Sequence, residues 1–217
     1  INALGGNDLL DGGDGDDSLI GGAGSDTYLV DSSYDKVVES SDSGTDLVIT
    51  SDSFTLSGNV ENLTKTGDAF VTLQGNELAN IIDGSEDGVN TLIGGAGNDT
   101  FIVNASRIGS IKENALSGTD TVKIVGGSVA LNQPSLANIE AYDFSQLTGS
   151  AAATLGFSSQ SLQTLTGSAG ADTITALSTF GNKNATLAGA AGNDRFVFSS
   201  KNQLVAASLD GGAGQDT

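Results

Sequence analysis

Residues 12–30, GGDGDDSLIGGAGSDTYLV, decide the fold of this chain, because they place glycine, aspartate and apolar residues at a fixed spacing. In nine-residue frames that begin at residues 3, 12, 21 and 30, the sixth position is aspartate and the eighth is apolar. The sixth positions are Asp8, Asp17, Asp26 and Asp35, and the eighth positions are Leu10, Leu19, Tyr28 and Val37. A disordered acidic linker does not require a fixed spacing of aspartate and apolar residues, so the pattern indicates a folded repeat.

A longer period surrounds the short one. GGAGSDTYLV begins at Gly21, GGAGNDTFIV at Gly94 and GSAGADTIT at Gly167, so a similar motif returns at the same interval both times. Within this long repeat, two consecutive frames of nine predict one coil of the chain. Towards the C-terminus, the motifs begin at residues 167, 189 and 211, a constant interval that is longer than two frames. We expect the extra residues to bulge from one turn.

The residue types at each position predict short strands joined by tight turns. Glycine permits positive φ and close approach of the backbone, and aspartate tolerates tight turns. The residues after the aspartate, as in TYL, TFI and RFV, are mostly β-branched or aromatic and too few for a helix. Stacked coils of this kind share one apolar interior, and the eighth position should face it. The sequence therefore predicts an all-β solenoid.

The amino-acid composition limits the classes of partner that the chain is expected to bind. The 217 residues contain 27 acidic and only 8 basic side chains, which gives a net charge of −19 and argues against nucleic acids and anionic membranes. No run approaches the ~18 apolar residues of a membrane span, so we expect no membrane insertion. Cysteine and histidine are absent, so a bound metal must have oxygen ligands. Oxygen ligands favour hard cations such as calcium or magnesium.

Three segments carry a family resemblance. GGDGDDSLI, GGAGSDTYL and GGAGNDTFI are similar to the nine-residue calcium-binding pattern Gly-Gly-x-Gly-x-Asp-x-apolar-x of the RTX family. GAAGNDRFV and GSAGADTIT resemble it with Ala190 and Ser168 in place of the second glycine, and GGAGQDT resembles it as far as the sequence runs. The resemblance implies a right-handed parallel β-roll with short strands, Gly-Asp turns that bind Ca2+, and an apolar interior.

The resemblance also implies where the ions lie. Each ion would sit between turns of successive coils on the same edge, held by sixth-position carboxylates and backbone carbonyls. This pairs Asp8 with Asp26, Asp17 with Asp35, Asp172 with Asp194, and Asp194 with Asp216. The predicted calcium-binding residues are Asp8, Gly12, Asp14, Gly15, Asp17, Gly21, Gly24, Asp26, Asp35, Gly94, Gly97, Asp99, Gly167, Gly170, Asp172, Gly189, Gly192, Asp194, Gly211, Gly214 and Asp216.

Departures from the motif predict coils that bind little calcium. Asn80, Asn90 and Ala185 occupy sixth positions, and the stretches 46–74 and 121–158 lack the complete Gly-Gly-x-Gly-x-Asp motif. We expect a single elongated repeat array over 1–217, a segment of a longer protein, with calcium-rich coils at 1–38 and 159–217. The coils at 75–102 should also bind calcium, whereas those at 39–74 and the irregular ones at 103–158 should be calcium-poor.

Several residues allow two interpretations. Asp14 and Asp16 are either extra ligands or solvated charges, and Asp46 and Asp120 are sixth-position equivalents in turns without the double glycine. Tyr28, Phe101 and Phe196 could form a glycan-binding row, but the eighth position favours the interior. Glu61 and Glu140 lie in related segments and near no recognisable catalytic motif, so we expect no enzymatic activity.

The leading functional hypothesis is a structural or adhesive segment of an exported bacterial surface protein, such as an adhesin or a surface-layer protein. Calcium would neutralise the turn carboxylates and couple binding to folding outside the cell. Neighbouring repeats or subunits of a surface assembly are possible partners, and the resemblance implies type I secretion. The alternative is a secretion and folding module of an exported enzyme or toxin. A ligand-binding solenoid would need an outward ladder of threonine or aromatic residues, which is not evident.

Overall fold

The computed structural model describes residues 1–41, 44–86, 88, 90–106, 108–114, 118–131, 138–155, 164–176, 185–198 and 207–217. These residues form an all-β parallel β-solenoid without a helix, as the sequence predicts. The chain divides into two compact units, one of residues 1–102 and 107–118 and the other of residues 103–106 and 119–217. Within the described residues, no helix is long and apolar enough to cross a membrane.

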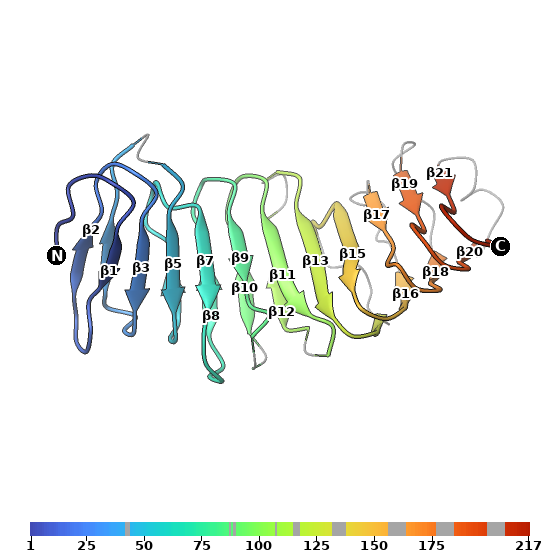
Figure 1. Cartoon of the computed structure of the whole chain (residues 1–217), viewed down its shortest axis with the longest axis horizontal. Helices are drawn as coiled ribbons and strands as arrows, with labels where there is room; N and C mark the ends of the chain where they lie inside the picture. Colours follow the sequence, from blue (N-terminus) through green and yellow to red (C-terminus); the bar gives the residue numbers. More distant parts are fainter. Residues whose placement is uncertain are drawn as a thin grey trace. The chain divides into compact units, whose positions relative to one another are not determined.

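The first unit contains three parallel sheets (Figure 1). The first sheet runs in the order β1 (Leu9–Asp11), β3 (Thr27–Val30), β5 (Leu47–Thr50), β7 (Asn62–Lys65), β9 (Ile81–Asp83) and the start of β11 (Thr100–Asn104). The second consists of β6 (Phe54–Thr55), β8 (Thr72–Gln74), β10 (Thr91–Ile93) and β12 (Ser110–Lys112), and the third pairs β2 (Ser18–Ile20) with β4 (Lys36–Val38).

The register between strands gives the length of each coil. Leu9 of β1 faces Thr27 of β3, and Ser18 of β2 faces Lys36 of β4, so the first coils have the predicted length of two nine-residue frames. Later coils vary, because the step from Thr27 to Leu47 is longer than two frames and the step from Leu47 to Asn62 is shorter. The nine-residue frame therefore holds only in the glycine-rich part of this unit.

The eighth positions of the repeat line the interior of the first unit. Leu10, Leu19, Tyr28 and Val37 are all buried, with at most 4 % of their surface exposed. Their strand neighbours point outwards because side chains alternate across a strand. Further along, the interior is continued by Val48, Leu63, Leu73, Ile82, Leu92 and Phe101. Tyr28 and Phe101 are core residues, which excludes a glycan-binding row at these two positions.

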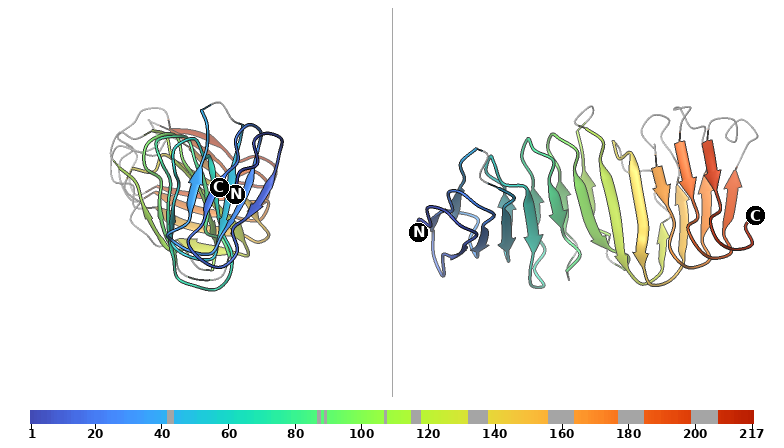
Figure 2. Two further views of the ribbon diagram at one scale, coloured as in Figure 1. Left: turned by 90° about the vertical axis from the view of Figure 1, so that its left-hand side faces the viewer. Right: turned by 45° about the horizontal axis from the view of Figure 1, so that its top comes forward.

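The second unit has two parallel sheets (Figure 2). One contains β13 (Thr121–Gly126), β15 (Ala141–Leu147), β17 (Thr164–Thr166), β19 (Ala185–Ala188) and β21 (Ala207–Asp210). The other contains β14 (Val129–Leu131), β16 (Ala151–Leu155), β18 (Thr173–Ala176) and β20 (Arg195–Phe198). Thr164 pairs with Thr186 and Thr186 with Ser208, which confirms the longer coil of constant length. Residues 177–184 and 199–206 of these coils lie outside the described residues, so the structure does not test the expected bulge.

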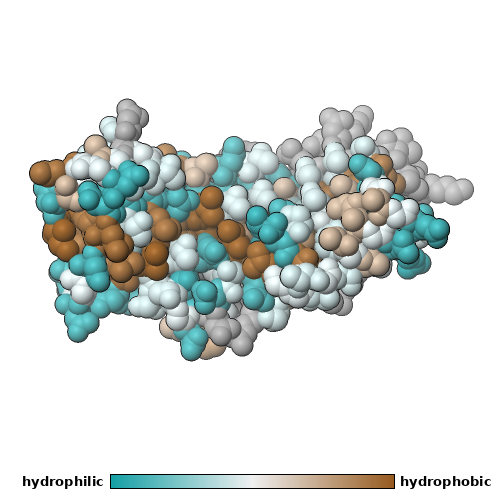
Figure 3. Space-filling model, in the orientation of Figure 1, coloured by the Kyte–Doolittle hydropathy of each residue, from teal (hydrophilic) through white to brown (hydrophobic). Residues whose placement is uncertain are grey.

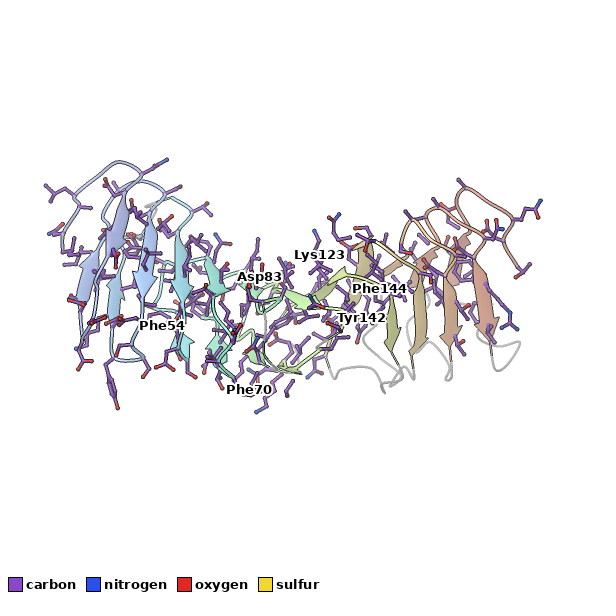
Figure 4. The ribbon with its side chains drawn as sticks, turned by 60° about the horizontal axis from the view of Figure 1, so that its bottom comes forward. Phe54, Phe70, Asp83, Lys123, Tyr142 and Phe144 are labelled. Carbon is purple, nitrogen blue, oxygen red and sulfur yellow. The ribbon has the colours of Figure 1, made fainter. Side chains whose placement is uncertain are left out.

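Regular strands also form where the complete calcium-binding motif is missing. The stretch 121–158 includes β13 to β16, with a register shift between Lys123 and Val125 against β15. Tyr142 and Phe144 of β15 are buried and their rings stack at a centroid distance of 6.4 Å (Figure 4). Apolar alternation alone therefore sustains the coil here. Phe196 of β20, unlike Tyr28 and Phe101, is only half-buried.

The outer face of the first sheet is partly apolar in the first unit. Leu9 and Ile81 are 68 % and 46 % exposed, and they occupy equivalent rows of β1 and β9. The space-filling view shows apolar surface over these strands (Figure 3). The glycine turns lie at the ends of the strands, away from this face.

Candidate calcium sites

The sixth-position carboxylates form ladders along the edges of the solenoid. In the first unit, Oδ1 of Asp26 accepts the backbone N–H of Asp8 at 2.7 Å, and Oδ1 of Asp46 accepts that of Asp26 at 2.7 Å. On the other edge, Oδ1 of Asp35 accepts the N–H of Asp17 at 2.8 Å. Each bond joins the same position of two successive coils. The ladder therefore brings together the predicted pairs Asp8–Asp26 and Asp17–Asp35.

The second unit repeats this arrangement. The N–H groups of Ala151, Asp172 and Asp194 donate to Oδ1 of Asp172, Asp194 and Asp216 at 2.6, 2.8 and 2.9 Å. Asp194 thus lies between two carboxylate neighbours, as the constant motif interval in this part of the sequence predicts. Charge-assisted bonds of this kind are about twice as strong as neutral ones, so they fix the carboxylates at the edge.

The second carboxylate oxygen of several of these aspartates indicates a bound cation. Oδ2 of Asp8, Asp17, Asp26 and Asp194 is buried and has no hydrogen-bond partner. Asp26 and Asp194 are each only 1 % exposed. A buried charged oxygen without a partner is costly, and native proteins rarely leave one unless a metal or water satisfies it. Carboxylate oxygens in a rigid turn are the ligands that Ca2+ prefers, so these residues fit a calcium ion.

The first glycine of each motif keeps space beside this oxygen. A Cβ atom added at position one would lie within 3.0 Å of the aspartate Oδ2 of its own turn. This holds at Gly12, Gly21, Gly94, Gly167, Gly189 and Gly211. At Gly12 the separation is 2.9 Å. Any side chain at this position would therefore displace the carboxylate or occupy the place of its ligand.

The glycine at the fourth position of the motif lets successive turns stack closely. Gly24 has a φ of 129°, and a Cβ there would overlap the carbonyl oxygen of Gly6 in the preceding coil. Equivalent overlaps with a preceding carbonyl occur at Gly97, Gly192 and Gly214. Gly170 differs, because its added Cβ would lie 3.1 Å from the carbonyl oxygen of Gly149. Gly15 has a positive φ but no neighbour within 4 Å.

Asp14 and Asp16 lie in the exposed turn before β2. Both side chains are exposed, and Oδ1 of Asp16 accepts a hydrogen bond from the Ser32 hydroxyl at 3.2 Å. Neither carboxylate belongs to the ladder of sixth positions. Their placement fits solvated charges that increase the negative potential around the Asp17–Asp35 pair.

The side-chain amides of the asparagines at sixth positions form hydrogen bonds with backbone groups. Nδ2 of Asn80 donates to the carbonyl oxygens of Val60 and Glu61, and its Oδ1 accepts the N–H of Asn76 at 2.8 Å. Nδ2 of Asn90 donates to the carbonyl oxygen of Gly84 at 3.1 Å. The amide thus supplies donors where an aspartate would need a cation. These bonds are compatible with the expectation that such turns bind little calcium. Ala185 begins β19.

Glutamates complete the ladders where the motif is lost. The N–H of Asp46 donates to Oε2 of Glu61, and the N–H of Asp120 donates to Oε2 of Glu140, both at 2.8 Å. These two glutamates occupy the place of the next sixth-position aspartate. The sequence repeat relates the segments that contain Glu61 and Glu140. It did not predict that these glutamates accept ladder hydrogen bonds, because the coil length changes at both segments.

Sequence reasoning missed one buried acidic residue. Glu39, only 9 % exposed, comes close to Asp26 and Asp46, and the three side chains offer oxygens within 4.8 Å of one another. The Tyr28 hydroxyl donates a hydrogen bond to Oε1 of Glu39. Burial raises the pKa of Tyr28 well above its ordinary value, and the hydrogen bond and negative charge of Glu39 raise it further. The hydroxyl therefore remains protonated. Burial also raises the pKa of Asp46, and the charges of Glu39 and Glu61 add to this increase.

Comparison with known families agrees with this geometry. The family model described as RTX calcium-binding nonapeptide repeat matches residues 1–30, 84–106 and 163–178. The chain carries RTX repeats. RTX repeats bind Ca2+, so the ladder of sixth-position aspartates forms part of a calcium-binding RTX β-roll. No curated protein and no solved structure gave a significant match to the chain.

The matched residues cover only part of the ladders. Asp8, Asp17, Asp26, Asp99 and Asp172 lie within the RTX matches. The turns of Asp194 and Asp216 lie beyond them, yet these aspartates make the same bond to the preceding coil as those within. The carboxylate ladder of the second unit therefore continues through the turn of Asp216.

Proposed function

We propose that this chain is a structural or adhesive segment of an exported bacterial surface protein, and that it folds on calcium binding outside the cell. The observation that carries the proposal is the set of buried, unpartnered carboxylate oxygens of Asp8, Asp17, Asp26 and Asp194. Without a cation, these oxygens oppose folding, because an uncompensated buried carboxylate is costly. With calcium, the same oxygens become ligands and binding stabilises only the folded state.

The calcium concentration outside cells suits such a module. Extracellular calcium-binding modules typically have dissociation constants of about 10⁻⁴ to 10⁻³ M. A chain of net charge −19 would remain unfolded in calcium-poor cytosol, because its carboxylates repel one another in a compact state. An unfolded chain is also the form that a secretion channel accepts. RTX repeats are typical of secreted proteins, and this supports an extracellular location.

One observation favours an extended structural role over a compact accessory domain. Turns with an aspartate at the sixth position alternate with turns that have Asn80 or Asn90 there. The amides of these asparagines donate hydrogen bonds to neighbouring backbone carbonyls without an ion. The solenoid thus continues through stretches that need no calcium. The alternative function, a secretion and folding module of an exported enzyme or toxin, requires an active domain outside residues 1–217.

Location and calcium sensitivity on the producing bacterium test this function. Antibodies against this chain should label the surface of intact cells in millimolar calcium, and added protease should leave the chain largely uncut. Removal of calcium by a chelator should make the same chain sensitive to protease, since it exposes the unfolded backbone. Recovery of the chain only from the medium, together with a catalytic activity, would favour the alternative function instead.

A further inference from the structure

Three oxygens converge beside Gly21, at the edge between β2 and β3. A Cβ atom at this position would lie within 3.0 Å of Tyr28 Oη, Asp26 Oδ2 and Glu39 Oε1. Gly21 has an ordinary negative φ, so its conformation alone does not require glycine. The absent side chain therefore leaves room for these oxygens and for whatever they bind.

One of the two carboxylate oxygens of Asp26 has no hydrogen-bond partner in the protein. Oδ1 of Asp26 accepts the N–H of Asp8, whereas Oδ2 is buried and makes no hydrogen bond. Asp46, fully buried, lies in the next coil and accepts the N–H of Asp26 at 2.7 Å. Three acidic groups with oxygens within 4.8 Å of one another carry a formal charge of −3 when ionised. Burying such charges without a counter-ion costs several kcal/mol per group.

Glu39 is held in place from two sides. Tyr28 donates its hydroxyl to Oε1, and the N–H of Ser40 donates to Oε2 at 3.2 Å. The backbone carbonyl of Glu39 accepts Nδ2 of Asn59 at 3.2 Å. Glu39 follows β4, outside the glycine turn that contains Asp26, and outside the residues that match the RTX model. Its carboxylate thus comes from a part of the coil that nonapeptide repeats do not include.

The same arrangement recurs further along the first unit. A Cβ at Gly94 would lie within 3.0 Å of Oδ2 of Asp99 and of Oε2 of Glu113. Oε1 of Glu113 accepts the N–H of Gly95 at 3.3 Å. Gly94 and Asp99 stand exactly where the long repeat places Gly21 and Asp26, and Glu113 stands one position beyond the equivalent of Glu39. Phe101 replaces Tyr28, so this second copy has the glutamate but not the hydroxyl.

We propose that Asp26, Glu39 and Asp46 form a calcium site of their own kind, in which a glutamate from outside the glycine turn closes the edge of an RTX coil. The proposal rests on the calcium-binding function above and deepens it. Two consecutive aspartates of the ladder supply two carboxylates, and Glu39 supplies a third that ordinary nonapeptide pairs lack. The site links the coil of the Gly21 turn to the coil that contains β5, where the double glycine is absent.

Counting bound calcium in a matched pair of variants tests the site. Glu39→Gln keeps the size and hydrogen-bonding capacity of the side chain but removes its charge. Glu77→Gln makes the same change at an exposed glutamate of the asparagine-closed turn. Equilibrium dialysis of the full chain should give one calcium ion fewer for Glu39→Gln than for the wild type, and no change for Glu77→Gln.

Terbium luminescence gives a second readout that does not depend on the stability of Glu39→Gln. Tb3+ replaces Ca2+ at carboxylate sites, and a tyrosine beside the ion transfers its excitation to it. Tyr28→Phe preserves the packing of the ring, so it should keep the number of bound ions but lose most of the tyrosine-sensitised emission. Tyr34→Phe alters a side chain that is 73 % exposed and directly precedes Asp35, so it should remove only the emission of an ion at the Asp17–Asp35 edge and leave that of the site beside Tyr28.

The outcomes separate this site from the general function. Calcium-induced folding of the wild type, together with an unchanged ion count in Glu39→Gln and full emission in Tyr28→Phe, would overturn the three-carboxylate site and leave the proposed function intact. Absence of any calcium binding by the wild type would overturn both. Loss of one ion in Glu39→Gln, with loss of emission in Tyr28→Phe, is the result that the structure predicts.

Discussion

Replacement of Asp194 by alanine should raise the calcium concentration that folds the second unit by about tenfold or more, equivalent to at least about 1.4 kcal/mol. Asp194 accepts the N–H of Asp172 and donates its own N–H to Asp216, so it joins two inter-coil steps. Its Oδ2 is buried and unpartnered. Loss of the carboxylate leaves the Asp172 N–H without its acceptor, which costs about 1–3 kcal/mol, and it removes a ligand from two adjacent ion positions.

Calcium titrations followed by circular dichroism measure this shift. Asp143→Ala is the matched control, because Asp143 lies in β15 of the same unit, outside any glycine turn, and its Oδ1 accepts the N–H of Ser145 two residues along the chain. We expect the control to fold at nearly the wild-type calcium concentration. Equal shifts for the two variants would contradict the assigned role of Asp194.

Replacement of Gly24 by alanine should lower the free energy of unfolding of the calcium-bound first unit by about 3 kcal/mol. Gly24 has a φ of 129°, a conformation that side-chain-bearing residues adopt only at a cost of about 1–3 kcal/mol. The added Cβ would also overlap the carbonyl oxygen of Gly6 in the preceding coil. The coils must then separate at the edge where Asp26 meets Asp8, so both stability and calcium affinity should fall.

Gly13→Ala is the matched control for the steric part of this effect. Gly13 also has a positive φ, of 76°, but an added Cβ would meet nothing within 4 Å. Urea unfolding at saturating calcium should show a loss for Gly13→Ala of only about 1 kcal/mol, the ordinary cost of replacing glycine at such a φ. If Gly24→Ala cost no more than Gly13→Ala, the close stacking of successive turns would be wrong.

The sequence predicted the fold wherever the glycine-rich repeat is intact. Leu10, Leu19 and Tyr28 are buried at the eighth position, and the constant spacing of Asp172, Asp194 and Asp216 is the true register of the second unit. These features are local, because one nine-residue frame contains both the turn and the inward side chain. The bonds between Asp8 and Asp26 and between Asp17 and Asp35 follow from the same frame.

The remaining features depend on contacts between coils of unequal length. Glu39 reaches Asp26 and Asp46 only because the coil between β3 and β5 is longer than two frames of nine. Glu61 takes the place of an aspartate after a coil that is shorter than two frames. A frame of nine cannot predict such shifts. The one available signal was the recurrence of glutamate at the same distance before Asp46 and Asp120, at Glu39 and Glu113.

Calcium-dependent folding is the central claim, and circular dichroism of this chain over a range of free calcium tests it most directly. At about 10⁻⁷ M free calcium the spectrum should be that of an unfolded chain, and at about 10⁻³ M it should show the full strand content. The change should be cooperative and should reverse when a chelator is added. Strand content that is already complete in excess chelator, and unchanged by calcium, would contradict the account.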